Sequence, residues 1–442
     1  MLFCDSYSDL FTSRGMSSVG HARTYLSGLL GTARRKNIES ISEAVQGCDY
    51  QGVEQFISSS PWSHCELSSR VSSELDGLLG GHPDSALYID ESGFAKKGRS
   101  SVGVARQYCG RLGKVDNCQI GVFAALGCGR RVGICDFRLY LPRSWCEDSR
   151  RLDKAGVPGD CRQYASKQEL ALEMIRSARA AGLGYGWVGF DALYGSDQGL
   201  CNLLEDMGER YVGDVISTVK VWTERPNWSF PEASMGRPRK RPVLEDGYGG
   251  KWITVGELVG ERFESEAVSV TYRSGAKGEL KARAWTMKVW TWKKDARQPR
   301  ERTLIVSEDA DGEIKASLSN CVDTRDPRRL VYMQRQRFWI EHAFGQAKSQ
   351  LGMAQYQVRK WLGWHHHIAL ACLASLFALK EQMLQQAEIP LLSVRDITEL
   401  LEYYLPRKGR SESEVIQAML DRHRRRQKDI DRRQAQMPLP DI

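Results

Sequence analysis

The sequence lacks the cysteine spacing that marks a disulfide scaffold or a structural zinc site. Its 442 residues include 12 cysteines, but they are scattered, and no two of them form a Cys-X-X-Cys pair. In a chain of this length, such a distribution argues against both kinds of covalent or metal support. It favours a reduced setting, and we expect a cytoplasmic protein.

Long apolar runs are also missing. The longest one, IALACLASLFAL at 368–379, is shorter than the roughly 20 residues that a membrane-spanning helix needs, so it predicts a buried helix. The N-terminal segment has no basic leader followed by an apolar core, and we expect no secretory signal. Three consecutive histidines at 365–367 would point about 100° apart on a helix, which argues against a three-histidine metal site.

Charge of either sign is not in strong excess. Lys and Arg outnumber Asp and Glu by 63 to 55, giving a net charge of +8, which permits a polyanionic partner without requiring one. The basic residues do cluster, at GFAKKGRSS (93–101), GRPRKRP (236–242) and RHRRRQKDIDRRQ (422–434). The second cluster fits either an extended arm in an A·T-rich minor groove or a solvated loop. The third fits a solvated helix or a disordered tail.

The pattern of apolar residues divides the chain into five segments. Residues 1–80 read as short helices and 81–216 as three strands followed by helix, strand, helix and strand, which is an α/β order. Residues 217–325 read as a β-rich insertion that includes strands at 251–259, 266–273, 280–292 and 302–309. Residues 326–385 return to helix, and 386–442 form a helical basic tail. The first three strands predict an antiparallel meander, and a helix that joins two later strands predicts parallel neighbours.

Three carboxylates stand out by their position in this order. Asp90 follows the β-run ALYI, and Asp191 ends the strand YGWVGF, so both lie where α/β sheets bind ligands. Taken singly, each also fits an ordinary acid that ends a strand or caps a helix. Glu341 lies on the predicted helix 326–353, and helical spacing puts it on one face with Arg337 and Lys348. That face fits a surface ion-pair ladder or a catalytic carboxylate.

Convergence of the three acids would favour a metal centre. Three neighbouring carboxylates repel one another unless a cation is present, and hard oxygen ligands suit Mg²⁺ or Mn²⁺. Two such ions roughly 4 Å apart would serve an in-line phosphoryl displacement. The sheet order and the position of the acids resemble the ribonuclease-H-like fold, a mixed α/β sheet, here with a β-rich insertion and helical regions at both ends.

Three motifs resemble those of bacterial insertion-sequence DDE transposases, in particular the insertion-sequence family numbered seven hundred and one. YIDESGFAKKGRSSVGVARQYCGRLGKVDNCQIGV resembles the first catalytic block, GWVGFDALYG the second, and RFWIEHAFGQAK the YxxRxxxExxxxxxK signature of the third. The resemblance covers about residues 35–385. It implies that Asp90, Asp191 and Glu341 bind two Mg²⁺ ions, with Mn²⁺ as a substitute, and that Arg337 and Lys348 contact DNA.

The resemblance also implies an enzyme that cuts DNA at the ends of a mobile element and joins the freed 3′-hydroxyls to target DNA. Its partners would be the terminal inverted repeats, the target DNA and a second copy of the chain, in the bacterial cytoplasm near the nucleoid, with no membrane. A catalytically silent DNA-binding regulator and a structure-specific nuclease remain alternatives. Further DNA contacts are expected from the basic clusters: Lys96, Lys97, Arg99, Arg237, Arg239, Lys240 and Arg241.

One position departs from the signature. Its tyrosine, three residues before Arg337, is replaced by Gln334. In relatives that tyrosine helps to hold DNA near the cleavage point, so the route by which ends are processed, including hairpin formation, stays open. One of the six tryptophans of the insertion could stack on a flipped base in such a step, while most of them fit the core of the insertion, and the sequence does not single one out.

Overall fold

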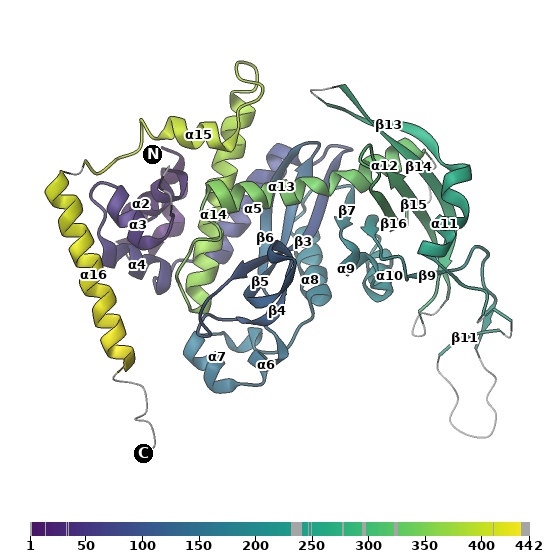
Figure 1. The fold of residues 1–442 in the computed structure, drawn as a ribbon, viewed down its shortest axis with the longest axis horizontal. Coiled ribbons are helices and arrows are strands. Elements are labelled where there is room, and N and C mark those ends of the chain that lie inside the picture. The colour runs from purple at the N-terminus through teal and green to yellow at the C-terminus, as the bar shows by residue number, and fades with distance from the viewer. Residues whose placement is uncertain are drawn as a thin grey trace.

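The computed structural model describes residues 2–13, 15–31, 33, 35–230, 241–245, 247–248, 250–275, 278–293, 298–321, 326–409 and 411–434. In this part of the chain, ten strands form one mixed sheet, which runs through the middle of the molecule (Figure 1). Its central strands are β3 (Ser85–Ala95), β4 (Ala105–Cys109), β5 (Lys114–Cys128), β6 (Arg131–Leu139), β7 (Trp187–Phe190) and β8 (Tyr211–Asp214).

The pairing of the central strands gives the ribonuclease-H-like order. β3 pairs with β5 and β5 with β6, both antiparallel, so the predicted meander is confirmed. β7 lies parallel to β3 on one side and to β8 on the other, as predicted for strands joined by helices. The connecting helices are α8 (Lys167–Ala180), α9 (Ala192–Gly195) and α10 (Gln198–Asp206). Short helices α6 (Arg143–Cys146) and α7 (Ser149–Ala155) precede them.

The β-rich segment continues this sheet. The expected strands at 266–273, 280–292 and 302–309 are confirmed, and one more follows them: β13 (Val268–Gly275), β14 (Gly278–Thr291), β15 (Arg300–Glu308) and β16 (Ile314–Ser319). β16 pairs antiparallel with β8, where Ser317 lies opposite Asp214. The smaller strands are β9 (Lys220–Val221), β10 (Trp228–Ser229), β11 (Val243–Leu244) and β12 (Ile253–Thr254). The limits proposed for the five segments stay predictions.

The strand expected at 251–259 is wrong. Only Ile253 and Thr254 are extended, as β12, and a helix, α11 (Val255–Glu266), follows them. Thr254 Oγ1 accepts a hydrogen bond from Glu257 N at 3.2 Å, and Thr254 N donates to the Glu257 carboxylate at 2.9 Å. This capping box starts the helix despite the β-branched residues around it.

Helices from both ends of the chain pack together beside the sheet. The N-terminal ones are α1 (Leu2–Asp5), α2 (Val19–Leu30), α3 (Ile38–Ala44), α4 (Tyr50–Ser58) and α5 (His64–Leu79), and the C-terminal ones are α14 (Trp361–Leu384) and α15 (Val394–Leu401). The last helix, α16 (Glu412–Gln434), follows them. α14 is long and apolar enough to cross a membrane, but 83% of its most apolar window is buried within the fold, as in a core helix. The histidines at 365–367 face this core, where His366 Nδ1 lies 3.0 Å from the carbonyl oxygen of Ile57.

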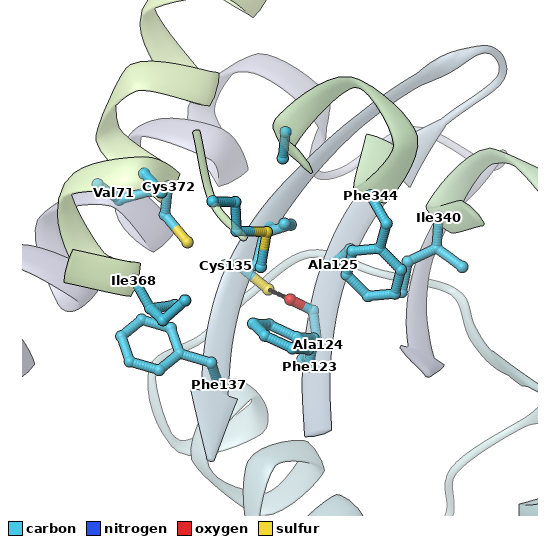
Figure 2. Close-up of a cluster of buried hydrophobic side chains, with 14 of the residues drawn as sticks. Val71, Phe123, Ala124, Ala125, Cys135, Phe137, Ile340, Phe344, Ile368 and Cys372 are labelled. Atoms are coloured by element: carbon cyan, nitrogen blue, oxygen red, sulfur yellow. Dashed lines mark hydrogen bonds between the residues drawn. The ribbon is translucent and has the colours of Figure 1, made fainter. Parts of the chain in front are cut away.

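The predicted helix 326–353 is divided at Arg337 into α12 (Pro327–Gln336) and α13 (Phe338–Gln350). α13 crosses the sheet and buries Ile340 and Phe344 against β5 (Figure 2). The Phe344 and Phe123 rings meet edge to face with centroids 5.2 Å apart. This packing fixes the rotation of α13 and leaves its neighbouring face, with Glu341 and Lys348, turned to the cleft described below.

Candidate active site

Strand register brings Asp90 and Asp191 to the same edge of two parallel strands. Ile89 of β3 pairs with Phe190 of β7, and Asp90 and Asp191 are the residues that follow them. β3 continues to Ala95, so Asp90 lies within a strand and not at its end, and it is 8% exposed. Asp191 also caps α9, because its Oδ1 accepts a hydrogen bond from Leu193 N at 3.0 Å.

Two glycines allow the turn after Asp191 to lie against β8. A Cβ on Gly195 would come within 2.1 Å of the carbonyl oxygen of Asp214, and one on Gly213 within 2.2 Å of the Phe190 ring. A side chain at Gly195 would therefore force backbone apart. The close approach sets Asp214, at the end of β8, near Asp90 and Asp191.

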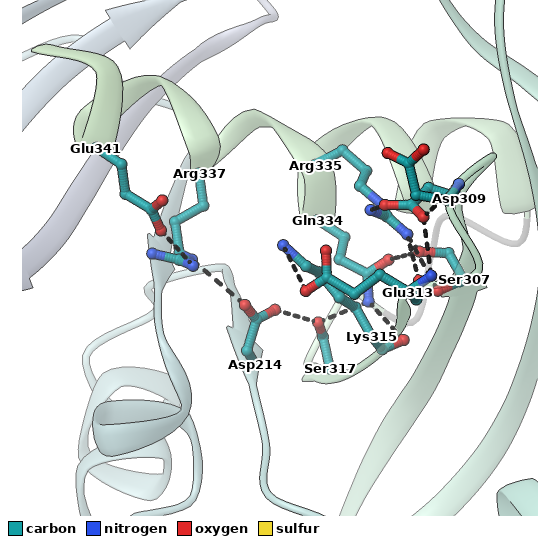
Figure 3. A network of polar contacts seen from close by, with 11 residues as sticks. Asp214, Ser307, Asp309, Glu313, Lys315, Ser317, Gln334, Arg335, Arg337 and Glu341 are labelled. Atoms are coloured by element: carbon teal, nitrogen blue, oxygen red, sulfur yellow. Dashed lines mark hydrogen bonds and ion pairs between the residues drawn. The ribbon is translucent and has the colours of Figure 1, made fainter. Parts of the chain in front are cut away.

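Arg337 lies at the centre of this group of acids. Its guanidinium nitrogens are 3.1 Å from Asp90 Oδ2, 3.3 Å from Asp214 Oδ2 and 2.8 Å from Glu341 Oε1 (Figure 3, which omits Asp90). The Arg337 side chain is 14% exposed, whereas that of Glu341 is 51% exposed. Burial lowers the pKa of Arg337, but the surrounding carboxylates raise it by more, so the net pKa lies above its usual value.

An open cleft of about 570 Å³ has these groups on its walls. Asp90, Asp191, Arg337, Glu341 and Lys348 all line it, so the structure brings together the five signature residues identified from the sequence. The remaining lining residues are Glu91, Ser92, Gly93, Gly110, Arg111, Phe344, Gly345 and Ser349.

The cleft carries more buried negative charge than its residues accommodate easily. Burial raises the pKa of Asp90 to about 7, with a smaller contribution from Asp191, while Arg337 opposes the rise. Burial also raises the pKa of Asp191, again against the effect of Arg337. The hydroxyl of Tyr194 is buried without a hydrogen-bond partner among the described residues, and the nearby carboxylates add to the burial that raises its pKa.

The chemistry of these donors suits a hard divalent cation. Asp90, Asp191 and Glu341 offer carboxylate oxygens to one cleft, and a cation bound there would offset the burial of the two aspartates and the repulsion between them. As they stand, no three His, Cys, Asp or Glu side chains in the described part of the chain form a group ready to hold an ion. Glu341 is turned toward Arg337, which accounts for the open arrangement.

The model of the DDE superfamily endonucleases matches residues 9–279, which is more than half of the chain. The chain belongs to this DDE endonuclease superfamily. The match includes Asp90 and Asp191 and ends before Glu341, whose place in the cleft comes from the structure alone. Enzymes of this superfamily generally use divalent metals.

One relative adds a more specific likeness. The probable transposase for insertion sequence element IS701 of Microchaete diplosiphon is 30% identical over 213 residues, which are 48% of this chain and 52% of that protein. The chain thus spans about half of the length of this relative. The resemblance to insertion-sequence DDE transposases is confirmed, and transposases act on DNA.

The basic residues of this DDE endonuclease that were predicted to contact DNA differ in their exposure. Lys97 and Arg99 are exposed, whereas Lys96 is half-buried with its Nζ 3.4 Å from the centroid of the Tyr356 ring. Burial lowers the pKa of Lys96 to about 7, so this lysine is not an exposed, fully charged surface cation. In the predicted minor-groove arm, Arg241 is exposed. The other three, Arg237, Arg239 and Lys240, lie outside the described residues.

A basic hairpin beside the cleft was missed from the sequence. β4 and β5 pair from Ala105–Cys118 to Cys109–Lys114, and Gly113 turns the chain with φ +63°. Arg106 and Arg111 are exposed and form no ion pair in the described part of the chain, and Arg111 lines the cleft. Tyr108 and Val115 pair across the hairpin and are also exposed, which only the structure shows.

The six tryptophans of the β-rich segment differ in exposure. Trp222 and Trp285 are buried, so their rings are not accessible for stacking on a base. Trp252 is 37% exposed, which makes it the most exposed of the six, and Lys220 Nζ lies over its ring, 3.6 Å from the centroid. The stacking of a base on one of the six stays a prediction, and the sequence did not single out Trp252.

Proposed function

We propose that the chain is a DNA transposase that cuts phosphodiesters at the ends of an insertion sequence and joins the resulting 3′-hydroxyls to target DNA. One observation carries the proposal: Asp90, Asp191 and Glu341 line a single cleft, with Lys348 and Arg111 on its wall. Carboxylates for a cation and cations for a phosphate, side by side, fit phosphodiester chemistry better than a DNA-binding role alone.

Asp90, Asp191 and Glu341 would hold Mg²⁺ or Mn²⁺, two ions in our proposal. Such ions supply Lewis-acid stabilisation of the leaving oxygen and activation of the attacking water or 3′-hydroxyl. The protein's own residues then do the positioning. Arg337 holds the carboxylates in place, and Lys348 and Arg111 bind the phosphates next to the scissile one. These two cations on the cleft wall give the DNA backbone basic groups to lie against.

DNA would enter over the rim formed by Lys97, Arg99, Arg106 and Arg111, four cations that all lie on the β3–β4 connection and the hairpin. This basic rim supplies sequence-independent affinity, while the helical N-terminal segment is proposed to read the terminal repeats. Because both ends of an element must be processed together, a homodimer on two DNA ends completes the proposal.

The test is nicking of a labelled terminal repeat by the purified protein with Mg²⁺, Mn²⁺ or EDTA. Asp90→Asn, Asp191→Asn and Glu341→Gln should each reduce nicking by more than the roughly 10- to 100-fold typical of residues outside the ligand set. Each should keep DNA binding in EDTA. Asp153→Asn is the control, because Asp153 is an exposed carboxylate paired with Arg162 away from the cleft.

The outcomes separate three functions. Metal-dependent nicking followed by joining of the 3′-end to a target plasmid supports a transposase. Nicking without joining would identify a nuclease, and binding that survives EDTA without cleavage under any metal would identify a regulator. Full activity in any of the three carboxylate variants would refute the assignment of the site.

A further inference from the structure

The residue that departs from the family signature is part of the interior. Gln334, on α12, is 3% exposed and does not line the cleft. Its Oε1 accepts a hydrogen bond from Ser307 Oγ of β15 at 2.5 Å, and its Nε2 donates to Ser317 Oγ of β16 at 2.8 Å. The amide therefore joins α12 to two strands of the sheet extension.

The contacts continue from Ser317 to the site. Ser317 Oγ donates to Asp214 Oδ1 at 2.6 Å, and Asp214 Oδ2 accepts from Arg337 Nε at 3.3 Å. Figure 3 shows the unbroken path from Gln334 through Ser317 and Asp214 to Arg337 and Glu341. Strand pairing supports it, because Ser317 and Asp214 are direct partners across β16 and β8.

Each contact along this path restricts the orientation of the next side chain. Gln334 supplies a donor to Ser317 Oγ, which leaves the serine hydroxyl hydrogen for Asp214. Held at one oxygen, Asp214 presents the other to Nε of Arg337. An arginine fork is planar and rigid, so fixing Nε also fixes the direction of its two terminal nitrogens. Those nitrogens contact Asp90 and Glu341.

We propose that Asp214 is a positioning residue: clamped by Ser317, it orients Arg337 and thereby sets Glu341 relative to Asp90. This inference rests on the proposed function. In the described part of the chain, Arg337 is the one side chain that holds the half-exposed Glu341 carboxylate by an ion pair or hydrogen bond. A misdirected guanidinium would therefore release the third acid of the cleft. The path makes the sheet extension part of the catalytic architecture.

Asp214→Asn and Ser317→Ala are the test variants. Asparagine keeps the volume of Asp214 but cannot satisfy both the serine hydroxyl and the guanidinium. We expect kcat for nicking to fall roughly 10- to 100-fold, as for other residues that orient ligand groups. The KM for the terminal repeat and DNA binding in EDTA should stay unchanged.

Ser319→Ala is the matched control. Ser319 lies two positions along β16, is fully buried, and donates to the carbonyl oxygen of Tyr211 on β8 at 2.6 Å, without a link to Arg337. It should lose as much thermal stability as Ser317→Ala while keeping kcat. Equal loss of kcat in both serine variants would reduce Ser317 to a structural role and overturn the proposal.

A second readout does not depend on activity. In ¹⁵N-arginine-labelled protein, the Nε–H signal of Arg337, assigned by its absence in Arg337→Lys, should exchange slowly in the wild type and in Ser319→Ala. It should exchange faster in Asp214→Asn and Ser317→Ala. Unchanged exchange in both variants overturns the positioning role even if the protein nicks DNA. A protein that never nicks DNA but shows the expected exchange refutes the proposed function and leaves the positioning of Arg337 by Asp214 established.

Discussion

Burial decides how the charged side chains of the cleft behave. Asp90 and Arg337 are both nearly enclosed, and each compensates part of the desolvation of the other. Lys348 is half-buried, with its Nζ 5.7 Å and 5.8 Å from the ring centroids of Phe94 and Phe344. Burial first, and then the nearby Arg111, lowers the pKa of Lys348 from 10.5 to about 8.

This pKa predicts a pH-dependent affinity for DNA. The pKa of Lys348 is lower in the folded protein than in the unfolded chain, so below about pH 8 the folded protein carries a desolvated cation. The free energy of unfolding therefore increases as the pH rises from 8 toward 10.5. A phosphate contact needs the charged form, so DNA affinity in EDTA should fall as the pH rises through 8. Fluorescence anisotropy with a terminal repeat at pH 6.5–9.5 measures it.

Lys348→Arg separates this lysine from other titrating groups. Arginine stays charged over the whole range, so the variant should bind DNA with no step near pH 8. Lys348→Gln should lower the dependence of log Kd on log salt by about one at pH 7 and have little effect at pH 9.5. The same pH step in wild type and Lys348→Arg would show that another group is responsible.

The site residues recognised from the sequence are those whose position follows from local pattern. Asp90 and Asp191 come after apolar β-runs, and Glu341 shares a helix face with two cations. Asp214 also ends a strand, so the same pattern was present, but its importance depends on Ser317, which is 103 positions away. Lys96 was expected at the DNA surface because its neighbours are basic, but its ammonium group packs over the aromatic ring of Tyr356.

At the scale of elements, neighbouring sequence signals can favour different secondary structures. The segment that forms α11 contains β-branched residues typical of strands, yet its T-x-x-E spacing at Thr254 and Glu257 is a capping box, and that local signal decides the structure. The single helix expected over 326–353 divides at Arg337 because α12 packs on the sheet extension and α13 on the central strands. The sequence of residues 326–353 indicates neither packing partner.

The β4–β5 hairpin carries a prediction at this scale. Arg106→Gln with Arg111→Gln should weaken binding to any DNA sequence and lower the salt dependence of log Kd by about two, because each cation neutralises one phosphate. Tyr108→Ala should add a loss that salt does not change, since its exposed ring offers apolar contact. Electrophoretic mobility shifts at several salt concentrations measure both effects.

A paired substitution elsewhere is the control for the hairpin. Arg262 and Arg395 are exposed, but each is already paired with a carboxylate, Glu266 and Glu399 respectively. Arg262→Gln with Arg395→Gln changes the net charge by the same amount at residues that do not line the cleft, so it should leave the salt dependence unchanged. If both double variants lost affinity equally, net charge and not the hairpin would explain the binding.

For the whole molecule, the main consequence of the structure is that the β-rich segment and the central strands β3–β8 share one sheet. The sequence predicted an insertion, and only the pairing of β16 with β8 shows that its strands extend the existing sheet. Arg302 of β15 strengthens the junction. It is fully buried, forms an ion pair with Glu205 of α10, and donates to Asn202 Oδ1 at 2.9 Å.

A continuous sheet predicts that both parts unfold together. Glu205→Ala leaves the Arg302 guanidinium buried without its carboxylate, and we expect a loss of about 3 kcal/mol, the low end for a broken buried pair, since Glu205 is itself 30% exposed. Hydrogen exchange should show the same loss of protection in peptides from β15 and from β5. Glu301→Ala, on the same strand but in a surface pair with Lys288, should cost at most about 1 kcal/mol. Loss confined to the β13–β16 peptides would mean that the extension opens independently, and Ser317 could then not act as a fixed support for Asp214.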